Sequence, residues 1–210
     1  MKKVLFIVLF IIVFFLISFP VFSQDKPDAL QKYRNSEYDE AIKICINEID
    51  KMPRNLDSYT VLGWSLVKLG KYQEALDYGL AALKISRYDT RIIENIGEAH
   101  YYLGNNLEAL KYFEEYVSLV ESGGRVDVVY YYMGEIFIRL GEFNHADIAL
   151  TTALYHSPNV ARWWSRLGYA REMAEDYKWA LDAYDRALRL NPSYTEAIRG
   201  KGRVQTKLTA

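Results

Sequence analysis

Residues 164–192 read WSRLGYAREMAEDYKWALDAYDRALRLNP, and this stretch decides the fold. Its first half places Leu167 and Gly168 three and four residues after Trp164, so that the three share one face of a helix. Its second half places a small residue, Ala180, twelve residues before a closing proline, Pro192. The spacing predicts two helices packed against each other, with small positions on one facing bulky positions on the other.

The same pattern recurs along most of the chain. The first-helix spacing also begins at Tyr59, Ile93 and Tyr130, and a glycine follows four residues later each time. The small residues of the second helices are separated by 34, 34, 37 and 34 positions; they are Ala41, Ala75, Ala109, Ala146 and Ala180. The period is therefore 34 residues, with three extra residues near Gly123. This insertion is predicted to be an exposed loop, with a hinge as the alternative.

The pattern resembles the tetratricopeptide repeat (TPR), which has W-x2-L-G-x2-Y in its first helix, then A-x3-F, then a proline, within 34 residues. Pro53 and Pro158 lie twelve residues after their alanines, as Pro192 does. The resemblance covers most of residues 24–210. It implies an all-α protein, an α-solenoid of antiparallel helix pairs, because one pair alone cannot bury enough apolar surface.

The repeat boundaries follow from the period, and the first repeat is degenerate in its first helix. The mid-helix glycines, such as Gly63, imply close approach of the paired second helix, since glycine there costs about 1 kcal/mol relative to alanine. We expect about five TPR repeats and a capping helix, at about 24–55, 56–89, 90–126, 127–160, 161–193 and 194–210.

The N-terminus has the features of an export signal. Two lysines precede residues 4–22, a stretch of 19 residues without charge that contains Pro20. We expect a signal peptide at 1–23, cleaved after Ser23. An uncleaved membrane anchor is the alternative, because a spanning helix needs about 20 apolar residues. The chain is therefore predicted to be exported, periplasmic or extracytoplasmic, and to contact the membrane only through this segment if it is retained.

Catalysis is not indicated by the sequence, and we expect no enzyme, no cofactor and no metal site. The three histidines, His100, His145 and His156, are assigned to three different helices, and no zinc-ligand spacing is present. Cys45 falls at a core position, where an inert thiol is expected. A formal net charge of -1 gives no reason to expect nucleic acid as a partner.

In the family that the chain resembles, the first helices line a concave surface. The face of each first helix opposite its buried stripe is rich in aromatic residues here, and these are predicted to act as anchors with charged residues giving selectivity. The alternative is that the aromatic rings pack against neighbouring first helices. The candidate partner-binding residues are Trp64, Lys68, Arg91, Glu94, Glu98, Tyr101, Tyr102, Tyr131, Glu135, Arg139 and Tyr169.

These features favour a non-catalytic scaffold in the cell envelope that binds a protein or an extended peptide on its concave face. The alternative is a small-molecule or lipid-binding accessory subunit of an envelope transport system, which would use the same aromatic groove as a pocket.

Overall fold

A computed structural model describes residues 28–209, and within this range the chain forms eleven helices and no strand, which confirms the all-α class. The predicted signal peptide lies outside the described residues. None of the described helices is long and apolar enough to cross a membrane. The helices are α2 (Ala29–Arg34), α3 (Tyr38–Lys51), α4 (Leu56–Lys68), α5 (Tyr72–Leu83), α6 (Thr90–Leu103), α7 (Asn106–Leu119), α8 (Val126–Leu140), α9 (Phe143–His156), α10 (Ala161–Met173), α11 (Tyr177–Leu190) and α12 (Thr195–Thr209).

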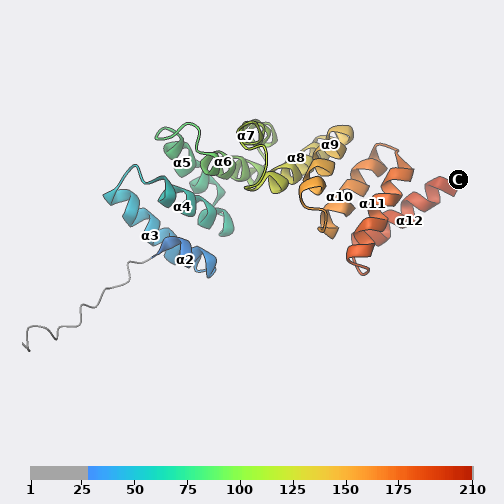
Figure 1. Cartoon of the computed structure of the whole chain (residues 1–210), viewed down its shortest axis with the longest axis horizontal. Helices are drawn as coiled ribbons and strands as arrows, with labels where there is room; N and C mark the ends of the chain where they lie inside the picture. Colours follow the sequence, from blue (N-terminus) through green and yellow to red (C-terminus); the bar gives the residue numbers. More distant parts are fainter. Residues whose placement is uncertain (1–27, 210) are drawn as a thin grey trace, which may run out of the picture.

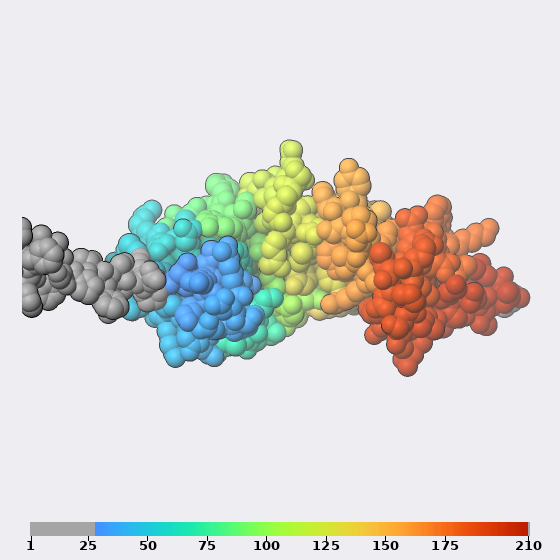
Figure 2. All heavy atoms as spheres, turned by 60° about the horizontal axis from the view of Figure 1, so that its bottom comes forward, coloured from blue at the N-terminus to red at the C-terminus, as the bar shows by residue number. Residues whose placement is uncertain are grey.

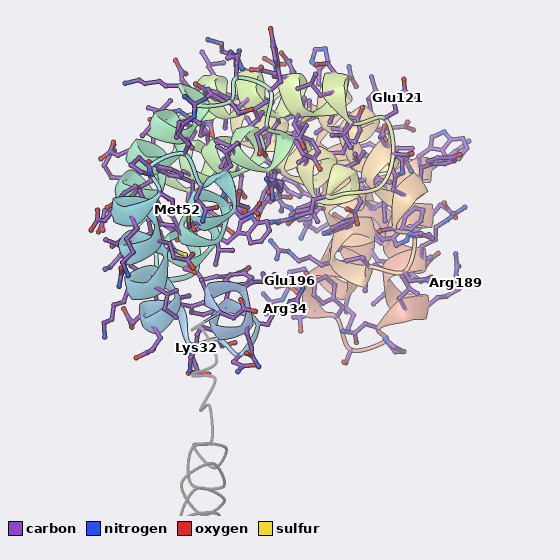
Figure 3. All side chains as sticks on the ribbon, turned by 60° about the vertical axis from the view of Figure 1, so that its left-hand side comes forward. Lys32, Arg34, Met52, Glu121, Arg189 and Glu196 are labelled. Carbon is purple, nitrogen blue, oxygen red and sulfur yellow. The ribbon has the colours of Figure 1, made fainter. Side chains whose placement is uncertain are left out.

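The helices follow one another as stacked pairs that form a curved, elongated body (Figures 1 and 2). Each even-numbered helix from α4 to α10 contacts the next even-numbered helix, whereas α3, α5, α7, α9 and α11 do not contact one another. The even-numbered helices therefore form the more tightly packed inner layer of the arch seen in Figure 3. This layer provides the inner face of the solenoid.

Local signals set the ends of the helices. The Asp28 side chain accepts hydrogen bonds from the backbone N–H groups of Leu30 and Gln31, and so caps α2. Asp89 caps α6 in the same way. Gly104 ends α6 with a φ of 81°, a left-handed conformation that glycine adopts without the strain of a side chain.

The recurrent mid-helix glycines allow close packing, but not always against the expected partner. A Cβ atom on Gly97 would lie 2.6 Å from the Phe113 ring on α7, the paired second helix, as predicted. At Gly63 the prediction is wrong, because the nearest group is the Asn95 side chain of α6, 2.5 Å away. Asn95 fills this space and donates a hydrogen bond to the Thr60 carbonyl oxygen at 3.1 Å.

The apolar core is divided at α6. Ile92 and Ile96 belong to a cluster formed by helices α2 to α6, whereas Ile93 and Tyr101 belong to a cluster that continues towards α11. Helix α6 thus has core contacts on both sides, and its remaining face belongs to the inner layer. This places the polar residues of α6 at the middle of the inner face.

Candidate partner-binding face

The inner face is built from α4, α6, α8 and α10, and all eleven candidate residues lie on these helices. They divide into three groups by their surroundings. One group is buried and acidic, one consists of tyrosines covered by arginines, and one is exposed to solvent. Each group offers a partner different chemistry.

Two buried glutamates form the first group. The side chains of Glu94 and Glu98 are 3% and 5% exposed, and one nitrogen of Arg125 lies 3.0 Å and 3.4 Å from their carboxylate oxygens. The Tyr132 hydroxyl donates a hydrogen bond to Glu98 at 2.8 Å. We call Glu94, Glu98, Arg125 and Tyr132 the acidic centre. Its glutamates are unavailable as surface contacts, contrary to the prediction, because Arg125, Tyr132 and Trp64 of α4 lie against them.

Burial dominates the titration of the acidic centre. Desolvation raises the pKa of Glu94 to about 8, and Arg125 opposes this shift only in part. Burial and the adjacent Glu98 carboxylate also raise the pKa of Tyr132 far above its usual value, so this hydroxyl remains a donor. At neutral pH, Glu94 therefore holds a proton for much of the time, and the acidic centre is close to electrically neutral.

The three-residue insertion places Arg125 at the acidic centre. Arg125 is the residue that precedes α8, and its backbone N–H donates a hydrogen bond to the Tyr116 hydroxyl at 2.9 Å. Gly123 and Gly124, with φ of 78° and 55°, turn the chain just before it. The insertion therefore places a cation over α6, and this contact is more specific than the simple exposed loop that was predicted.

Arginines cover the tyrosines of the second group. The Arg139 guanidinium lies 4.0 Å from the centre of the Tyr101 ring, and that of Arg162 lies 5.1 Å from the Tyr131 ring. Tyr101 and Tyr131 are only 6% and 4% exposed. The prediction that they form an exposed aromatic strip is wrong, because arginines from the next inner helix and rings such as Trp163, 5.1 Å from Tyr131, enclose them.

A third arginine completes this region. Arg166 donates a hydrogen bond to Glu135 at 2.6 Å, and its guanidinium lies 5.2 Å from the half-buried Tyr169 ring. We call Arg139, Arg162 and Arg166 the arginine patch. Glu135 and Tyr169 therefore both contact Arg166 within the inner face.

The remaining candidates are more accessible. Tyr102 is 43% exposed and stacks on Tyr72 with ring centres 4.8 Å apart. Lys68 is exposed, and Trp64 is half-buried beside Tyr33. Arg91 is exposed too, but its ion pairs with Asp57 at 2.7 Å and Asp89 at 2.8 Å show that it joins α6 to α4.

Sequence reasoning missed Arg125, Tyr132, Arg162 and Arg166. Arg162 lies two residues before the marker Trp164, just as Arg91 lies two residues before Ile93. Applying this offset to every repeat would have found Arg162. No comparable signal identifies Arg125 or Arg166, because their roles depend on contacts with residues 27 and 31 positions away.

Other reactive side chains lie apart from one another. Cys45 is fully buried, and desolvation raises the pKa of its thiol to about 12, which disfavours the nucleophilic thiolate. Within residues 28–209, no three histidine, cysteine, aspartate or glutamate side chains are grouped as metal ligands would be.

A stacked series of helix pairs with a continuous inner face defines an α-solenoid repeat protein. Three stretches match family descriptions of the tetratricopeptide repeat, at residues 55–87, 90–119 and 161–194. The chain belongs to the tetratricopeptide-repeat family. Its fold is that of a protein–protein interaction scaffold, and TPR domains bind protein or peptide partners.

Solved structures share this fold. MamA matches with a TM-score of 0.70 and 17% identity over 81% of this chain and 98% of that chain. YrrB, described as a TPR protein with an unusual peptide-binding site, matches with a TM-score of 0.69 and 20% identity over 83% of this chain and 88% of that chain. The APC/C heterotetramer Cut9–Hcn1 matches with a TM-score of 0.74 and 18% identity over 84% of this chain and 35% of that chain. No curated protein matches by sequence.

Proposed function

We propose that this chain is a non-catalytic scaffold of the cell envelope that binds a protein or an extended peptide along its inner face. The observation that supports this most directly is the row of accessible side chains on successive inner helices. These side chains are Lys68, Tyr102, Arg139 and Arg162. They come from α4, α6, α8 and α10, so an extended segment could contact each helix in turn.

The nature of this surface favours a peptide over a lipid or another apolar small molecule. An apolar ligand needs exposed apolar lining, but the rings of Tyr101 and Tyr131 are buried beneath guanidinium groups. A polypeptide can use the exposed charges and ring edges without displacing them. The envelope location rests on the sequence of residues 1–23, and N-terminal sequencing of the chain from fractionated cells would test it.

Site-specific photocrosslinking in the native host tests the binding proposal. A photoreactive phenylalanine analogue would replace Tyr102 on the inner face and, in a matched control, Tyr155, which is 84% exposed on the outer helix α9. We expect one dominant protein adduct from position 102 and none of that adduct from position 155. Equal adducts from both positions, or none from position 102, would contradict the proposal.

A further inference from the structure

The arginine patch has a surplus of positive charge. It contains three guanidinium groups, and in the described part of the chain only Arg166 has a carboxylate partner, Glu135. Arg139 donates to the Tyr101 carbonyl oxygen at 3.1 Å and to the Asn106 side chain at 3.4 Å, both of which are uncharged groups. Three cations and one anion leave a net charge of about +2 in this region.

Several acidic side chains of the inner helices, in contrast, have partners of opposite charge. Glu94 and Glu98 pair with Arg125, Asp57 pairs with Arg91, and Glu172 of α10 pairs with Arg203 of α12 at 2.6 Å. On α8 and α10, Arg139 and Arg162 have no carboxylate partner among the described residues. Exposed Lys68 on α4 adds another, since the described residues provide it with no ion pair.

Contacts with tyrosine rings position the arginines for an anion. A guanidinium beside an aromatic ring is restricted in its rotamers and can still donate two N–H groups to a carboxylate. Arg139 lies 4.0 Å from the centre of the Tyr101 ring, and Arg162 lies 5.1 Å from that of Tyr131, each on the preceding inner helix. Less side-chain entropy is then lost when a ligand binds.

The Tyr131 ring under the patch is buried in charged surroundings. It lies under Arg162 and close to Glu135 and Arg166. Its hydroxyl interacts with the Arg162 guanidinium, so Tyr131 helps to hold this arginine in place.

We propose that the arginine patch binds the side-chain carboxylates of an acidic, extended protein segment. This inference rests on the proposed function and specifies the chemistry of the partner. The positive surplus and the two exposed guanidinium groups that have no carboxylate partner match a carboxylate. A protein segment is favoured over nucleic acid because TPR domains bind protein or peptide partners.

Fluorescence anisotropy with the purified full-length chain tests the inference. The probes are a labelled, C-terminally amidated 12-residue peptide that alternates glutamate with alanine, the same peptide with glutamine, the same peptide with lysine, and a 12-nucleotide oligothymidine. We expect the glutamate peptide to bind about tenfold more tightly than the glutamine peptide, with binding weakened by added salt. The lysine peptide should bind more weakly than either.

Two double variants show where the glutamate peptide binds. Arg139→Gln with Arg162→Gln should remove the preference for glutamate over glutamine. The control, Lys111→Gln with Arg189→Gln, makes the same change in net charge on exposed sites of α7 and α11 and should retain it. Figure 3 shows Arg189 on the outer side of the arch. Circular dichroism would verify that both variants keep their helical content.

The inference is overturned if the glutamate peptide does not bind, or if the glutamine peptide or oligothymidine binds as tightly or more tightly. It is also overturned if the two double variants show the same preference for the glutamate peptide over the glutamine peptide. The proposed function is judged separately, by the adduct from position 102. An adduct that persists in the Arg139→Gln, Arg162→Gln variant would retain the scaffold and reject the acidic partner, whereas its complete absence in the wild-type chain would reject the scaffold.

Discussion

The acidic centre and the arginine patch lie on one face but arrange their charges differently. In the acidic centre two carboxylates are buried, and a single cation, Arg125, reaches them from a loop. In the arginine patch the cations lie towards the surface above buried rings, and only one carboxylate balances them. Burying charge makes the first region important for stability, whereas exposed surplus charge leaves the second available for binding.

The largest difference between the regions should be seen when one arginine is removed from each. Arg125→Met leaves the buried Glu98 carboxylate without its cation and should lower the free energy of unfolding by about 2–3 kcal/mol. Arg139→Met removes an arginine that has no carboxylate partner and should cost about 0.5 kcal/mol. Urea denaturation followed by circular dichroism would compare the two variants. Equal losses in the free energy of unfolding would contradict the difference between the acidic centre and the arginine patch.

The acidic centre should also make stability depend on pH. Burial raises the pKa of Glu94 well above its ordinary value of 4.5, so the folded state retains a proton that the unfolded state releases. The stabilising contribution is complete below about pH 4.5 and is lost as the pH rises towards 8. Between about pH 6 and pH 8 we expect the free energy of unfolding to fall by about 2 kcal/mol. Glu94→Gln should abolish this fall, and an unchanged slope in that variant would show that other groups cause it.

The smallest expected effect separates the two glutamates. Because Glu94 is largely protonated at neutral pH, Glu94→Gln should change stability little. Glu98 accepts a hydrogen bond from Tyr132 and pairs with Arg125, so Glu98→Gln should be about 1 kcal/mol more destabilising. Thermal unfolding of both variants at neutral pH would measure this difference. The opposite order would mean that Glu94 is the ionised member of the pair.

Much of the fold could be predicted because it depends on local spacing. Residues such as Trp164, Leu167 and Gly168 fall on one helix face whatever surrounds them, and the 34-residue period repeats that face. All eleven candidates lie on α4, α6, α8 and α10, the first helices of their repeats. Exposure of the candidates could not be predicted, because it depends on long side chains from neighbouring helices.

The sequence by itself determined the helix pairs, their order and the faces they turn towards one another, since these follow from periodicity within about a dozen residues. Only the tertiary structure decided which side chains a partner can reach. Arg139 covers Tyr101 from 38 positions away, and Arg125 reaches Glu98 from 27 positions away. Such contacts depend on how one repeat stacks on the next, and the pattern within a single repeat contains no record of that geometry.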